Sequence, residues 1–150
     1  MVSKTLQISM YTMLVGNPSN PPTIVPVSTF GANYVLDGFP NTNGAYWNGG
    51  NAPLNFYKSI RNINVDTTRV PASVAVTGIN WAVSQATSLR DMVFTMTESS
   101  EHVGMSMSGG GSGTFMGDLT FIGGSVGLNV NNQQFHFRSA IVERPDQFIF

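Results

Sequence analysis

Two aspartates, Asp91 and Asp118, have the spacing most suggestive of joint chemistry in this 150-residue sequence. They stand at the same point of successive short repeats, so stacked repeats would place them about one strand spacing, ~4.8 Å, apart. Two carboxylates at ~5 Å are the arrangement of a retaining glycosidase. The alternative is a polar ladder whose short side chains bond their own backbone at a turn. Because Asn62 and Ser139 fill the same position in the flanking repeats, the ladder is favoured.

The other candidates for catalysis or metal binding are less well grouped. Glu98, Glu101 and His102 fall in a loop, where His102 could serve as an acid–base group but a solvated pair is the simpler interpretation. The Gly-rich segment 109–113 lacks the following Lys and helix of a phosphate-binding loop and is interpreted as a flexible turn. His136 alternates with two phenylalanines and is predicted to point outward. Two His and scattered acids, without Cys, predict no metal site and no cofactor.

The elements that must hold these side chains are short runs of alternating apolar residues. The second run of each repeat begins at positions 60, 89, 116 and 137, in steps of 29, 27 and 21 residues. Two short strands per repeat of this length are typical of a solenoid, and the Gly, Ser, Thr and Asn between them disfavour a helical repeat. We therefore predict an all-β fold, a single-stranded parallel β-helix. It forms one domain over residues 1–150, with the coils clearest from 56 to 143.

The segment before the repeats is predicted to contain a strand from Leu6 to Val15 and shorter strands over 23–27 and 34–36. Residues 37–55 form a long loop, and such loops in compact domains are commonly functional. Its aromatic residues favour an ordered loop that packs on the helix or lines a sugar site. The possible sugar-stacking residues are Tyr46, Trp47 and Tyr57.

Composition excludes several classes of partner. Charged residues make up 10% of the chain and the net charge is −1, with no basic patch in the sequence, so nucleic acid is not an expected partner. No apolar stretch approaches the ~20 residues of a membrane span, and the first ten residues lack the pattern of a signal peptide. The segment after Val142 has no polar cap of the kind that solenoids need, so we expect a truncated fragment of a longer solenoid.

Several segments carry a more specific resemblance, covering nearly all of residues 5–143. They are 16–18, 20–23, 60–66, 70–73, 78–81, 85–89, 111–121 and 132–135. In this order they resemble a block of the fungal exo-β-1,3-glucanases of glycoside hydrolase family 55, within the pectate-lyase-like superfamily of right-handed β-helices. Where that family commonly has Gly-Ile-His-Trp, this chain has Gly78-Ile79-Asn80-Trp81.

The resemblance implies an extracellular enzyme that releases single glucose units from β-1,3-glucan with inversion, although this chain shows no signal peptide. The family's catalytic Glu lies on a second β-helix half, which is missing here, so the resemblance implies a fragment that is inactive alone. By motif, the residues that would position substrate or water are Gln85, Ser112, Gln133 and Gln134. Amides and hydroxyls can orient water but cannot protonate a leaving oxygen. The structural alternative for these residues is hydrogen bonding within turns.

Two other functions remain open from the sequence. The first is a non-catalytic module that binds glucan or cell wall through the loop aromatics. The second is a lyase or polygalacturonase on the same fold, which is disfavoured because the clustered acids for Ca²⁺ or for paired-Asp catalysis are missing. The expected partner is β-1,3-glucan or a related polysaccharide, with neither nucleic acid nor membrane.

Overall fold

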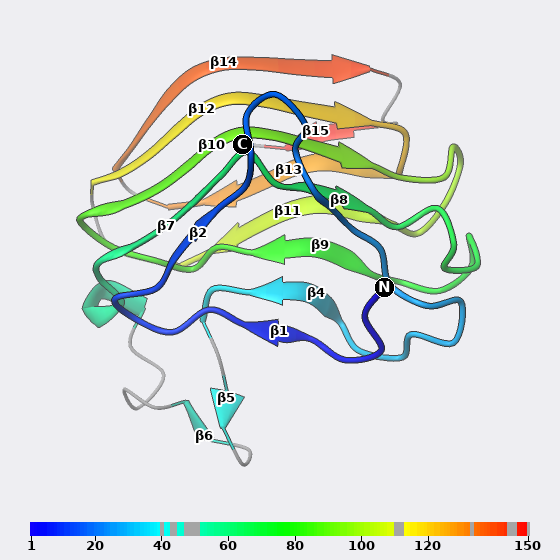
Figure 1. Ribbon diagram of the computed structural model, residues 1–150, viewed down its shortest axis with the longest axis horizontal. Coiled ribbons are helices and arrows are strands. Elements are labelled where there is room, and N and C mark those ends of the chain that lie inside the picture. Colours follow the sequence, from blue (N-terminus) through cyan, green and yellow to red (C-terminus); the bar gives the residue numbers. More distant parts are fainter. Residues whose placement is uncertain are drawn as a thin grey trace.

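The chain winds into a stack of coils whose parallel strands form two facing sheets, as the computed structural model shows (Figure 1). The residues that the structure describes are 1–39, 41–42, 45–46, 52–109, 113–132, 134–143 and 147–149. The six-stranded sheet has the order β1 (Leu6–Gln7), β4 (Tyr34–Asp37), β9 (Thr77–Asn80), β11 (Val103–Ser108), β13 (Val126–Asn131) and β15 (Gln147–Ile149).

The seven-stranded sheet contains the longer strands of the coils. Its order is β14 (Phe135–Glu143), β12 (Thr114–Ile122), β10 (Thr87–Thr95), β7 (Lys58–Arg61) and β2 (Met13–Val15), with β8 (Asn64–Asp66) beside β10 and β3 (Thr23–Ile24) beside β8. An antiparallel hairpin of β5 (Asn41–Thr42) and β6 (Ala45–Tyr46) projects from the lower end of the stack in Figure 1. A 3₁₀ helix, η1 (Ala52–Leu54), follows it.

The strand register confirms the predicted parallel β-helix. Leu89 pairs with Ile60 on one side and with Met116 on the other, and Met116 pairs with Phe137. These pairs reproduce the repeat steps read from the sequence. Among the described residues there is no α-helix, and no helix has the length and hydropathy that crossing a membrane would require.

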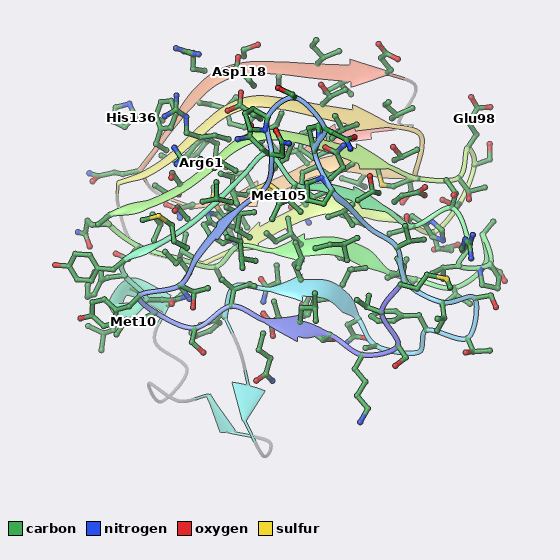
Figure 2. All side chains as sticks on the ribbon, viewed as in Figure 1. Met10, Arg61, Glu98, Met105, Asp118 and His136 are labelled. Carbon is green, nitrogen blue, oxygen red and sulfur yellow. The ribbon has the colours of Figure 1, made fainter. Side chains whose placement is uncertain are left out.

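The core lies between the two sheets and is built from columns of inward side chains. Ile60, Leu89 and Met116 are fully buried in one column, and Met105 lies between the sheets (Figure 2). The apolar side chains of each coil therefore pack on the apolar side chains of the next coil. In this way a solenoid builds one continuous core, although a single coil cannot bury its own apolar side chains.

Glycine is the second residue of the shorter strand in two coils, because an aromatic ring occupies the space beside it. A Cβ added to Gly104 would lie 2.6 Å from the Gly127 carbonyl oxygen and 2.6 Å from Cδ1 of Phe121. Gly78 has the same relation to Gly104 and Phe94. The backbone can approach the rings this closely only where no side chain intervenes.

Gly104→Ala is therefore expected to destabilise the fold by about 1–3 kcal/mol, since overpacking forces the backbone and ring to shift. Gly31→Ala is the matched control, because a Cβ at Gly31 meets nothing within 4 Å. Urea unfolding of both variants measures the difference, and equal stabilities would contradict the close packing described above.

The predicted continuous strand from Leu6 to Val15 is wrong. The structure has β1 and β2 in different sheets, separated by a turn that contains Tyr11. Tyr11 has a φ of 61°, a left-handed conformation that lies outside the extended β region and turns the chain from one sheet to the other. Apolar and polar residues keep alternating through the corner of the coil between β1 and β2. The periodicity of the sequence therefore does not show where β1 ends.

Candidate functional site

One corner of each coil bends the long strands of the seven-stranded sheet. Asn62, Asp91, Asp118 and Ser139 have φ values of 54°, 53°, 55° and 62°, and register places them in successive coils. Short polar residues tolerate this left-handed conformation. The Asp118 carboxylate accepts a 2.7 Å ion-paired hydrogen bond from the exposed Arg138 guanidinium. These features fit the polar ladder predicted for this position better than a catalytic carboxylate pair.

The opposite corner, just before the strands of the seven-stranded sheet, carries a second row of left-handed residues. Tyr11, Tyr57, Ala86 and Gly113 have φ values of 61°, 54°, 56° and 90°. The register of the strands that follow puts these four in successive coils. We call this row the tyrosine edge. The Tyr11 N–H donates to the Tyr57 carbonyl at 2.6 Å, which links the first two coils.

Two of the four glutamine and serine positions predicted to contact substrate adjoin the tyrosine edge. The Gln85 carbonyl accepts from the Tyr57 N–H at 3.4 Å, and the Gln134 carbonyl accepts from the Gly113 N–H at 2.9 Å. Both glutamine side chains are exposed. Cγ of Gln85 lies 3.1 Å from the place where a Cβ on Gly113 would stand, so Gln85 leans over the next coil. Ser84 Oγ donates to Gln85 Oε1 at 2.6 Å and orients the amide.

The remaining predicted site residues fall outside the described part of the chain. Ser112, Gln133 and Trp47 are not described, and of Tyr46 only the backbone of β6 is described. Tyr57 is thus the one described member of the predicted sugar-stacking set with a placed side chain, and it belongs to the tyrosine edge.

A stacked pair of exposed aromatic rings forms the start of this edge. The Tyr11 and Tyr57 ring centroids are 5.3 Å apart with an interplanar angle of 11°, and the residues are 76% and 53% exposed. A hollow of about 300 Å³ lies beside them, lined by Tyr11, Thr12, Met13, Tyr57, Lys58, Ser59 and Ala86. Sequence reasoning missed Tyr11. A usable signal exists, since each Tyr stands three residues before an inward aliphatic residue, Leu14 or Ile60.

A buried polar cluster lies behind the edge, and sequence reasoning did not find it. Lys58 is 2% exposed, and its ammonium donates to the carbonyls of Ile8 and Gly38 at 2.7 Å each. Burial lowers the pKa of Lys58 to about 8, against a smaller opposing effect of the Asp37 carboxylate. These bonds join β7 to the turn after β1 and to the end of β4.

Asp37 is the anionic member of this cluster. Its Oδ1 accepts from the Phe39 N–H at 2.9 Å and from Asn80 Nδ2 at 2.8 Å. Asn55 Nδ2 donates to the carbonyls of Gly38 and Ala82 at 2.8 Å each. The carboxylate, 8% exposed, is therefore occupied in holding the base of the 37–55 loop.

The interpretation of His102 as a solvated loop residue is wrong. The side chain is fully buried, with Nδ1 3.0 Å from Thr67 Oγ1 and Nε2 3.3 Å from the Pro71 carbonyl oxygen. Burial lowers its pKa, and the hydrogen bond to Pro71 opposes that effect. His102 therefore joins neighbouring coils as a neutral side chain.

Glu98 lies on the far side of the coils from His136, which is exposed as predicted (Figure 2).

The described residues contain no group of three or more His, Cys, Asp or Glu side chains that could hold a metal ion. The polar and aromatic side chains described at the tyrosine edge and next to it include the rings of Tyr11 and Tyr57 and the amides of Gln85 and Gln134. Such groups bind and orient neutral polar ligands, because rings offer an apolar face and amides offer both donors and acceptors.

Comparison with known proteins identifies the architecture. Residues 1–149 match the family model described as rhamnogalacturonase A/epimerase, pectate lyase-like. The chain is 32% identical over 146 residues to a glucan 1,3-beta-glucosidase of Cochliobolus carbonum, covering 96% of this chain and 18% of that protein. It is 35% identical over 154 residues to a probable glucan endo-1,3-beta-glucosidase of Arthroderma benhamiae, covering 99% of this chain and 17% of that protein.

A relative with a different name is also similar. The non-secreted LysM effector LysM15 of Penicillium expansum is 41% identical over 128 residues, which cover 83% of this chain and 9% of that protein. The chain thus spans less than a fifth of the length of each of these relatives.

Proposed function

This chain belongs to the rhamnogalacturonase A/epimerase, pectate lyase-like family, and from that premise we propose that it binds β-1,3-glucan as one part of a glucan-hydrolysing protein. The observation that carries the proposal is the tyrosine edge, with the exposed side chains of Gln85 and Gln134 beside it. Because coils repeat at ~4.8 Å, such a row suits an elongated, uncharged chain better than a small ion.

The chemistry of the edge supports binding and positioning rather than proton donation. Inverting hydrolysis needs a carboxylic acid to protonate the leaving oxygen and a second group to activate water on the opposite face of the sugar. The Gln85 and Gln134 amides can orient water or a hydroxyl but have no proton to give at neutral pH. Asp37, on the same side of the coils, is buried and hydrogen-bonded. We therefore propose that the proton donor comes from another part of the whole protein.

The proposal is tested by titrating the complete chain with laminarin, a soluble β-1,3-glucan, while assaying released glucose. We expect binding without glucose release. Gln85→Ala and Gln134→Ala should each weaken binding about 2- to 10-fold, since a net hydrogen bond contributes about 0.5–1.5 kcal/mol. Asn20→Ala, which removes an exposed amide from the 17–20 turn, is the control and should leave binding unchanged. An absence of laminarin binding would refute the proposal.

A second candidate is a non-catalytic glucan-binding module. The observation that favours it is the 41% identity to a protein named as an effector rather than as a hydrolase. Both candidates require laminarin to bind at the tyrosine edge. They differ in the activity expected of the whole protein. Release of glucose from laminarin by the whole protein would support the hydrolase, and binding without release would support the module.

A further inference from the structure

We propose that the tyrosine edge contains a subsite for one glucosyl residue, which stacks on the face of the Tyr57 ring turned away from Tyr11, in the hollow that Tyr57 lines together with Ala86. This inference rests on the proposed function and names the contact that would recognise the glucan. Its basis is the order of side-chain sizes along the edge: two large rings in the first two coils, then a methyl group, then no side chain.

Tyr11 covers one face of the Tyr57 ring, and the tilted ring of Phe56 lies 6.0 Å from Tyr57, centroid to centroid, at an interplanar angle of 58°. Tyr11, in the preceding coil, stacks on the Tyr57 ring at 5.3 Å with nearly parallel planes, so the normal to the rings runs along the stack of coils. The other face of Tyr57 therefore looks toward the following coils. Ala86 occupies the same corner in the next coil with only a methyl group and lines the hollow together with Tyr57. In the coil after that, the Gln85 side chain lies over Gly113. Tyr57 is 53% exposed despite the covering ring of Tyr11.

The hollow beside these rings has the size and character of a sugar site. Its volume of about 300 Å³ is at the lower end of the range for small-molecule sites, ~300–1,000 Å³. Thr12 and Ser59 add hydroxyls to an otherwise largely apolar lining. Lys58 contributes to the wall, but its ammonium is directed to buried carbonyls, so no charge is offered to a ligand. A neutral occupant is favoured over an acidic sugar.

The backbone holds the rings in place at an energetic cost. Tyr11 and Tyr57 have left-handed φ values, which are unfavourable for a residue with a Cβ. Strain of this kind persists where the surrounding structure enforces it, and it is concentrated at functional sites. A rigid ring loses little conformational entropy when a ligand stacks on it, which is the advantage of tyrosine in recognition.

A β-linked glucosyl residue matches this arrangement chemically. Its ring hydroxyls are equatorial, so both faces expose C–H groups that can lie on an aromatic ring, while the hydroxyls point sideways. The Gln85 side chain lies next to Gly113, at the side of the proposed subsite, where its amide can meet a hydroxyl.

Isothermal titration of the complete chain with laminaritriose, the β-1,3-linked glucose trimer, tests the subsite. Tyr57→Ala should weaken binding about tenfold, since stacking and burial of one ring are worth about 1.4 kcal/mol. Tyr57→Phe should stay within about twofold, because the ring face and not the hydroxyl makes the contact. Ala86→Leu should weaken binding at least as much as Tyr57→Ala, because the added side chain fills the space above Ala86.

Two further variants separate binding from folding. Tyr57→Gly removes the ring and also relieves the backbone strain, so this variant should stay folded, and its circular dichroism spectrum should match that of the wild type. Ile141→Ala removes an apolar side chain with the same 53% exposure from β14, beyond the corner at Ser139, and should bind like the wild type.

The outcomes distinguish the two proposals. If the wild type binds laminaritriose and Tyr57→Gly and Ala86→Leu bind it equally well, the subsite is refuted while the proposed function stands. If the wild type binds no laminaritriose, or binds trigalacturonate more tightly, both are refuted. Wild-type binding that is lost in those two variants and kept in Ile141→Ala supports the subsite.

Discussion

Phe121→Ala is expected to lower the free energy of unfolding by about 3–5 kcal/mol, the usual cost of removing a fully buried aromatic ring. The Phe121 ring is 0% exposed and stacks on Phe94 with centroids 5.1 Å apart and planes 12° from parallel. Because a whole domain is typically stable by only about 5–15 kcal/mol, this single change should remove a large part of the total. Urea unfolding monitored by circular dichroism measures it.

Phe115→Ala is the matched control on the same strand, β12. Phe115 faces outward, half-buried, and its ring lies 5.5 Å from the Arg90 guanidinium carbon. A partly exposed cation–π contact contributes about 0.5–1 kcal/mol, so the expected loss is well below that for Phe121. Equal losses at the two positions would contradict the assignment of inward and outward faces along β12.

The stability of the chain is expected to rise between pH 7 and pH 10 through Lys58. Its pKa in the folded protein is about 8, below the ordinary 10.5 that it has when unfolded. Between these values the unfolded chain binds more protons than the folded one, so raising the pH favours folding. Below pH 8 the folded protein bears the full free-energy cost of burying the charged ammonium. Between pH 8 and pH 10 the free energy of unfolding should rise by about 1.4 kcal/mol per pH unit, which gives about 2–3 kcal/mol by pH 10.

Lys58→Met isolates this effect from other groups that titrate at high pH. Chemical unfolding of the wild type and the variant at pH 7 and pH 10 gives two differences in stability. The wild type should gain about 2–3 kcal/mol relative to Lys58→Met over this interval. A difference that does not change with pH would mean that the Lys58 ammonium is solvated in the folded protein.

The fold could be predicted from sequence because each coil repeats the same inward positions. Ile60, Leu89 and Met116 recur at intervals set by the strand register, and the short polar residues at Asp91 and Asp118 mark the bend between them. Both signals are local, since they depend on alternation and turn chemistry within a few residues. The two sheets follow from stacking such units.

The site could be predicted only in part, because its other features arise from contacts between distant segments. His102 is buried by Thr67 and Pro71, more than thirty positions earlier, so its loop position in sequence was misleading. Lys58 is held by carbonyls of Ile8 and Gly38, which no periodicity connects to it. A sequence pattern gives the direction of a side chain but not what another coil places beside it.

The most direct test of a glucan-binding tyrosine edge is a map of backbone amide chemical shifts of the ¹⁵N-labelled chain during titration with laminaritriose. We expect the largest changes to cluster at Tyr57, Gln85 and Ala86, with smaller changes at Gln134. Changes centred on the opposite corner, at Asp91 and Asp118, or no changes at saturating ligand, would contradict this expectation.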